Sequence, residues 1–94
     1  MMIFKTPQIR FDDKRLDYFF SGDIITATYD GIEDVFDFSE LPDGEVDSSL
    51  IDTILEFNPI IIAKKENGVL SVELLNFISE DASEQDKFPE WIEV

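Results

Sequence analysis

The sequence predicts a small, mainly β protein in which an antiparallel meander and a hairpin pack as a sandwich or a partly open barrel. Two dipeptides typical of type I′ hairpin turns, Asp30-Gly31 and Asn67-Gly68, each lie between apolar stretches. Apolar and polar residues alternate on both sides of these turns, as they do in half-buried strands. The 94 residues are 44% hydrophobic and include nine Phe, which is enough for one thin core.

A short first strand is expected around Gln8–Phe11, paired with the next strand through a turn at Asp12–Lys14. A weaker turn signal at Ser21-Gly22 combines with Asp30-Gly31 to predict a three-stranded meander over residues 16–38. Two-residue loops at both turns place the same residues on one face, because directly opposed residues of neighbouring strands share a face. This apolar face comprises Leu16, Tyr18, Phe20, Ile25, Ala27, Tyr29, Ile32, Phe36 and Phe38.

The other face of the meander is mixed in character. Its polar side chains are Asp17, Thr26, Thr28, Glu33 and Asp37, and its apolar exceptions are Phe19, Ile24 and Val35. Asp34 falls on the apolar face opposite Ala27, which indicates a charge at the sheet margin, a register slip or a carboxyl with a raised pKa. Acid–base catalysis would require such a carboxyl, but a chain of 94 residues leaves little room for a substrate cleft.

A second hairpin is predicted over residues 60–75, around the Asn67-Gly68 turn. The expected register sets Ala63 opposite Val72 and Ile61 opposite Leu74. One face of this hairpin is mainly apolar and the other is mixed, so the hairpin and the meander each offer an apolar face to bury.

The segment between these two units predicts one short helix over residues 48–56, with Asp47 available as its cap. Its apolar residues at helical spacing are Leu50, Ile51, Ile54 and Leu55. A strand remains the alternative, because Ile51, Thr53 and Ile54 are β-branched.

Residues 1–78 are predicted to form a single β-rich domain, followed by an acidic C-terminal tail over residues 79–94. The tail ends in an aromatic segment that contains the only Trp of the chain, Trp91. Aromatic side chains are frequent anchors at protein interfaces, so we predict that Phe88, Trp91 and Ile92 contact a protein partner. The alternative is that Phe88 and Trp91 fold back over the sheet of the chain itself.

An acidic loop before the predicted helix is the second candidate interaction site. Residues 30–47 carry eight acids and no base, and those without a clear place in a strand are Glu40, Asp43, Glu45 and Asp47. The loop could bind a cation weakly, but its spacing does not fit a calcium-binding EF-hand. We expect no metal site and no cofactor, and we place any functional acidic patch on this loop and the adjoining solvated sheet face.

The composition also limits the function. The chain has no Cys and no His, which disfavours most zinc sites and the common nucleophile–base pairs, so we expect no catalytic residues and no enzyme. The net charge of −15 disfavours direct binding to nucleic acid or to an anionic membrane and favours protein partners with basic patches. The sequence has no apolar run of membrane-spanning length and no signal-peptide pattern, so a cytoplasmic location is expected.

The order of several short segments resembles that of small uncharacterised proteins encoded in phages and prophages of Gram-positive bacteria, often near tail-module genes. The segments that carry the resemblance are Phe20-Ser21-Gly22-Asp23, Phe36-Asp37-Phe38-Ser39, Leu41-Pro42-Asp43-Gly44, residues 63–70, residues 72–77 and Phe88-Pro89-Glu90-Trp91. The resemblance implies a setting in the bacterial host cytoplasm or in the virion. It implies no functional residues.

These observations favour a non-catalytic protein-interaction module, a phage accessory or tail-assembly protein whose partner is a virion or tail component. The alternative is an acidic inhibitor that mimics a nucleic acid and occupies a basic host protein. The oligomeric state stays open, and a homo-oligomer is compatible with the sequence.

Overall fold

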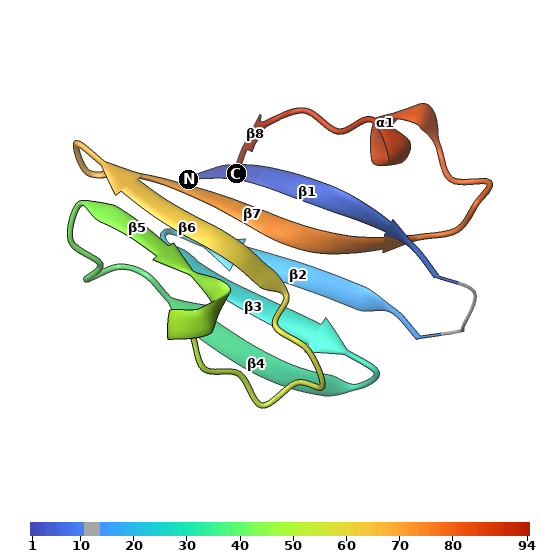
Figure 1. Cartoon of the computed structure of the whole chain (residues 1–94), viewed down its shortest axis with the longest axis horizontal. Coiled ribbons are helices and arrows are strands. Elements are labelled where there is room, and N and C mark those ends of the chain that lie inside the picture. The colour runs from blue at the N-terminus through green and yellow to red at the C-terminus, as the bar shows by residue number, and fades with distance from the viewer. Residues whose placement is uncertain (11–13) are drawn as a thin grey trace.

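The structure is a computed structural model that describes residues 1–10 and 14–94, and within these residues eight strands form two sheets (Figure 1). The smaller sheet has three strands in the order β2-β3-β4, and the larger has five in the order β5-β6-β7-β1-β8. The mainly β fold predicted from the sequence is therefore confirmed, in the form of two sheets and not of a closed barrel.

The three-stranded sheet is the predicted meander. Its strands are β2 (Leu16–Ser21), β3 (Ile24–Tyr29) and β4 (Ile32–Asp37). In the β3–β4 turn, Asp30 and Gly31 have φ angles of 52° and 80°, the left-handed values that a type I′ turn requires. Ala27 lies opposite Asp34, which confirms the predicted register.

The β2–β3 turn differs by one residue from the prediction. Its two loop residues are Gly22 and Asp23, so Leu16 pairs with Tyr29. Gly22 has a φ of 58°, and a type II′ turn places glycine at the first loop position because a positive φ is required there. Moving the turn by one residue shifts the pairing by two, so every side chain keeps its predicted face.

The five-stranded sheet combines local and distant pairings. Its strands are β5 (Gly44–Asp47), β6 (Ile60–Glu66), β7 (Val69–Ile78), β1 (Met2–Ile9) and β8 (Ile92–Glu93). The β6–β7 hairpin has the predicted register as far as Ile62, but a bulge at Ile61 pairs Leu74 with Ile60. Ile60 is therefore the fully buried partner of Leu74, a place that we predicted for Ile61.

β1 contradicts the prediction for the N-terminal strand. It pairs in parallel with β7 from Met2 to Ile9 and antiparallel with β8, whereas the sequence predicts that residues 8–11 pair with the following strand. The turn expected at Asp12–Lys14 lies largely on residues 11–13, outside the described residues. The prediction was wrong because a parallel partner lies far along the chain and no turn signal marks it.

The segment predicted as a helix over residues 48–56 is only partly helical. A 3₁₀ helix, η1 (Ser48–Leu50), follows β5, and the backbone from Ile51 to Pro59 is irregular. Asp47 caps η1 as expected, because its carboxylate accepts a hydrogen bond from the Ser49 N–H. The Asn58 side chain donates to the Ser48 and Ile51 carbonyls and so fixes this irregular segment internally.

Both sheets contribute to one core. The buried core residues are Ile3, Leu16, Ile25, Ala27, Tyr29, Phe36, Phe38, Leu55, Ile60, Ala63, Leu70, Val72 and Leu74. Two polar contacts also join the sheets: the Tyr18 hydroxyl donates to the Leu75 carbonyl at 2.6 Å, and Lys65 lies 3.6 Å from the Asp23 carboxylate. Burial raises the pKa of the Tyr18 phenol, so this group stays a protonated donor.

Candidate functional site

The predicted interaction residues lie at the two opposite edges of the five-stranded sheet (Figure 1). One set lies in β5 or in the turn before it, and we call it the acidic edge: Glu40, Asp43, Glu45 and Asp47. The other set lies in β8 or in the segment before it, and we call it the C-terminal edge: Phe88, Trp91 and Ile92. The order of the strands therefore separates the two sets by the width of the sheet.

The acidic edge is an ordered part of the fold, although the sequence suggested a loop. Asp43 accepts hydrogen bonds from the Asn67 and Gly68 N–H groups, at 3.2 and 3.4 Å, and so ties the turn between β6 and β7 to the start of β5. Glu45 lies directly opposite Lys64 in the register of the β5–β6 ladder. Two of the four predicted acids therefore hold or face the neighbouring hairpin.

Asp47 has a local structural role in the same edge. Its carboxylate accepts hydrogen bonds from the hydroxyl and the N–H of Ser49, at the start of η1. These two bonds lower the pKa of the Asp47 carboxyl below its ordinary value of 3.8. Glu40 is exposed in the turn that precedes β5.

The carboxylate that seemed out of place, Asp34, has specific partners. It accepts a 2.7 Å hydrogen bond from the Thr53 hydroxyl and a 3.1 Å bond from the Ile54 N–H. These bonds fasten the irregular segment after η1 to the edge strand β4, so the predicted register is correct and needs no slip. Across residues 1–10 and 14–94, no group of three or more acidic, His or Cys side chains is arranged to hold a metal ion.

The C-terminal edge is built from segments far apart in the chain. After β7, residues 79–83 lead to a single helical turn, α1 (Glu84–Lys87), and the chain then returns along β1 to form β8 (Figure 1). Ile92 pairs with Ile3, and the Val94 N–H donates to the Met1 carbonyl at 3.0 Å. These backbone contacts hold the aromatic segment in place.

The apolar side chains of this edge are largely exposed. The exposed fractions are 76% for Phe88, 46% for Trp91 and 40% for Ile92. The Trp91 ring also packs on Phe4 of β1, with ring centroids 5.5 Å apart. Of the two alternatives drawn from the sequence, folding back over the sheet applies in part to Trp91. Phe88 does not fold back and extends into solvent.

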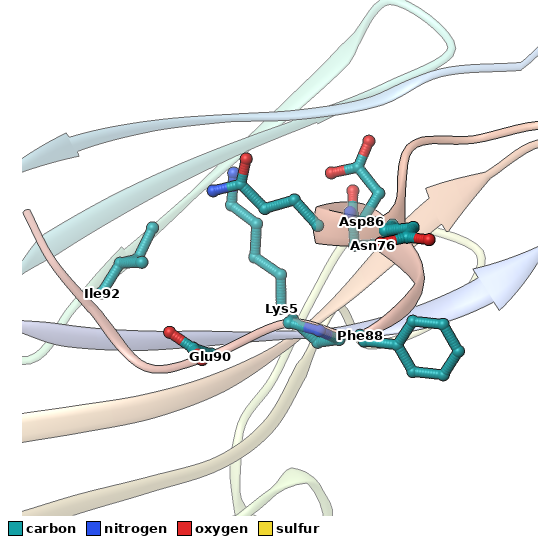
Figure 2. Close-up of a pocket in the computed structure, with 9 residues that line it drawn as sticks. Lys5, Asn76, Asp86, Phe88, Glu90 and Ile92 are labelled. Carbon is teal, nitrogen blue, oxygen red and sulfur yellow. The ribbon is translucent and has the colours of Figure 1, made fainter.

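A pocket of about 500 Å³ lies beside this edge, between the sheet and the returning chain. Its lining residues are Lys5, Asn76, Glu84, Gln85, Asp86, Phe88, Pro89, Glu90 and Ile92. Figure 2 shows the Lys5 side chain rising from β1 into the pocket, while the Phe88 ring points away from it. Lys5 and this pocket could not be predicted from the sequence, because both depend on the distant pairing of β1 with β7 and β8.

The outer face of the three-stranded sheet is a further exposed surface. Phe19, Thr26 and Val35 form one row across β2, β3 and β4, and Phe19 and Val35 are 68% and 54% exposed. The neighbouring rows carry acids, with Asp17 and Glu33 on one side and Asp37 on the other. Of the predicted apolar exceptions on this face, Phe19 and Val35 are therefore solvent-facing, whereas Ile24 is half-buried.

The comparisons with known proteins give no match: no protein-family model, no curated protein and no solved structure is similar to this chain. In the part of the chain that the structure describes, no helix is long and apolar enough to cross a membrane.

Proposed function

We propose that the protein is a non-catalytic protein-interaction module and that the C-terminal edge is its principal binding surface. One observation carries the proposal: Phe88 and Trp91 are exposed aromatic side chains on a segment whose backbone is already fixed by β8 and by the Trp91–Phe4 contact. Aromatic residues are enriched among the residues that dominate binding energy at protein interfaces. A segment that is ordered before binding loses less conformational entropy when it binds.

The acidic character of the chain favours a partner of opposite charge. The net charge of −15 attracts a protein with a basic patch and repels polyanions. We further propose, from the resemblance to phage and prophage proteins, that the module is an accessory or tail-assembly protein of the bacterial host cytoplasm whose partner is a virion or tail component.

A site-specific cross-linking experiment tests the proposal. A photoreactive amino acid is placed at Phe88, with Glu40 of the acidic edge as the matched control position, and each protein is irradiated in a lysate of phage-producing host cells. The proposal predicts one discrete cross-linked protein from position 88, lost in a Trp91→Ala background, and none from position 40. Equal cross-linking at both positions, or none at position 88, would contradict it.

An acidic inhibitor that mimics a nucleic acid is the second candidate function, and the high acidic charge favours it. The two candidates differ in salt dependence, because a contact between charged surfaces weakens as the screening length falls from roughly 10 Å at 0.1 M salt to roughly 3 Å at 1 M. Mimicry predicts a complex that dissociates in high salt and competes with DNA or RNA. A module that binds through Phe88 and Trp91 predicts a complex that loses less of its affinity in high salt than mimicry predicts and that does not compete with nucleic acid.

A further inference from the structure

The backbone of β1 has a defined direction for its hydrogen-bonding groups. The Arg10 N–H donates to the Ile78 carbonyl of β7, so the even-numbered residues of β1 direct their N–H and C=O groups toward β7. The Met1 carbonyl accepts from the Val94 N–H, so the odd-numbered residues point to the opposite side, where β8 lies. The β1–β7 and β1–β8 ladders therefore agree on which N–H and C=O groups of β1 point to each side.

β8 covers only the beginning of this second side. It pairs with Met2 and Ile3, whereas β1 continues to Ile9. Within the described residues, no backbone hydrogen bond reaches the Lys5 or Ile9 N–H from that side. The open edge of β1 therefore presents two N–H groups and the carbonyls of residues 5, 7 and 9.

Pro7 fits this arrangement. A proline has no N–H, so within a sheet it is tolerated where that N–H would point away from the neighbouring strand. Pro7 is odd-numbered and lies opposite Asn76 of β7, so the donor that it lacks is on the open side. Pro7 therefore removes no hydrogen bond from the β1–β7 ladder.

The pocket beside this open edge has a net acidic lining. Glu84, Asp86 and Glu90 supply three carboxylates, and Lys5 supplies the single cation. Lys5 makes no ion pair with any residue that the structure describes. Pro89 and Ile92 add apolar surface to the same pocket.

We propose that the open edge of β1 and this pocket bind an extended segment of the partner protein as an added strand, with a basic side chain of that segment placed among the three carboxylates. Strand addition uses backbone groups for affinity and side-chain pockets for selectivity, and this site offers both. This inference rests on the proposed function, because it specifies how the C-terminal edge engages its partner.

A second copy of the same chain is a poorer occupant. Each copy carries a net charge of −15, so two copies repel each other. Direct pairing of two β1 edges would also bring together two Lys5 side chains and two Pro7 rings, and charged side chains and prolines are features that keep edge strands from pairing with their own copies. A basic segment from another protein avoids the repulsion between two acidic chains and brings no second Pro7 ring to the edge.

Amide hydrogen exchange measured by NMR tests the proposal on the whole chain. The probe is a capped peptide of alternating Lys and Val, and the control is the same peptide with Glu in place of Lys. We expect the Lys–Val peptide to slow exchange of the Lys5 and Ile9 amides about tenfold or more, because both gain a hydrogen-bond partner. The Phe4 and Gln8 amides, which already face β7, should change little, and the Glu–Val peptide should have no effect.

A pair of variants isolates the backbone contribution. Ile9→Pro removes an edge N–H that no other strand uses, whereas Ile9→Ala removes the side chain and keeps the N–H. We expect Ile9→Pro to weaken binding of the Lys–Val peptide about tenfold or more and Ile9→Ala to weaken it less than about threefold. A normal β-sheet circular dichroism spectrum for both variants confirms that they are folded.

Three results would overturn the inference. They are no binding of the Lys–Val peptide, binding without protection of the Lys5 and Ile9 amides, and protection that rises with protein concentration in the absence of peptide, which would assign the edge to a second copy. If cross-linking from position 88 still captures a partner in those cases, strand addition is wrong and the proposed function stands. If position 88 captures nothing, the proposed function itself fails.

Discussion

The acidic residues at one edge of the five-stranded sheet and the aromatic residues at the other edge differ in what they contact. At the acidic edge, Asp43 and Asp47 accept hydrogen bonds from backbone groups of their own chain. At the C-terminal edge, Phe88 and Trp91 keep much of their apolar surface in solvent. The comparison indicates that the acidic stretch before η1 is partly structural, and that the C-terminal edge is the one with exposed apolar surface left for binding.

Side-chain chemistry accounts for the difference. A short carboxylate beside a turn satisfies N–H groups that otherwise have no partner, so aspartates are used readily within the fold. An aromatic side chain gains from burial in proportion to its apolar area, and a sheet edge in a chain of 94 residues has little left to cover it. Exposed aromatic rings on an ordered edge are therefore available to another protein.

The largest expected effect comes from removing the C-terminal edge. Truncation after Lys87 deletes β8 and the Trp91–Phe4 contact, and we expect binding to the cross-linked partner to fall by more than about 100-fold. All the deleted residues except the half-buried Pro89 are exposed, so the free energy of unfolding should fall by only about 1–2 kcal/mol. Urea unfolding and a binding titration check both values. Retained binding by a truncated chain that is much less stable would mean that this edge is core.

A single substitution gives the next largest effect. Trp91→Ala should weaken partner binding by about 2 kcal/mol, or roughly 30-fold, as is typical of an aromatic residue at the centre of an interface. Glu40→Gln at the acidic edge is the control, and it should leave affinity and stability unchanged. Isothermal titration calorimetry measures the change, and equal losses in the two variants would remove the distinction between the edges.

Asp43→Ala should give the reverse result. The substitution removes the acceptor of the Asn67 and Gly68 N–H groups, so the free energy of unfolding should fall by about 0.5–1 kcal/mol. Partner affinity should stay the same, because the altered group lies at the far edge of the sheet. Unchanged stability in urea unfolding together with weaker binding would assign Asp43 to the interface.

The smallest effect concerns pH. The pKa of Asp47 is lower in the folded chain than its ordinary value of 3.8, so its ionised form stabilises the fold above that value. This contribution is lost as the pH falls through the folded pKa, because the unfolded chain then binds the proton more readily. Asp47→Asn should therefore reduce the stability difference between pH 7 and pH 3. Urea midpoints of the variant and the wild type at both pH values measure it, and identical differences would contradict this role.

Turn chemistry explains which parts of the fold could be predicted. Asp30-Gly31 determines the β3–β4 register from adjacent residues alone, and the structure has that register. The placement of β1 depends on β7, more than sixty residues away, and only Pro7 gives a local sign that one side of that strand is open. The β2–β3 turn shows the intermediate case, in which Gly22 marks the turn but its exact position depends on the turn type.

The same reasoning applies to the candidate site. Phe88, Trp91 and Ile92 were identified by residue type alone, but Lys5 could not be, because the pocket that it lines forms only when β1 lies between β7 and β8. For the acidic residues, the sequence predicted the negative charge of the edge but could not predict the groups that donate hydrogen bonds to the carboxylates. The hydrogen bonds of Asp43 join two turns that are far apart in the sequence.

The single Trp of the chain allows the most direct test of the central claim, that the C-terminal edge contacts the partner. Incorporation of fluorotryptophan places one fluorine reporter at Trp91, and fluorine NMR then follows this edge alone while the unlabelled cross-linked partner is added. If this edge contacts the partner, the resonance of Trp91 shifts or broadens in proportion to complex formation, in high salt as well. An unchanged resonance in a sample where gel filtration shows that the complex has formed would mean that the partner binds elsewhere on the molecule.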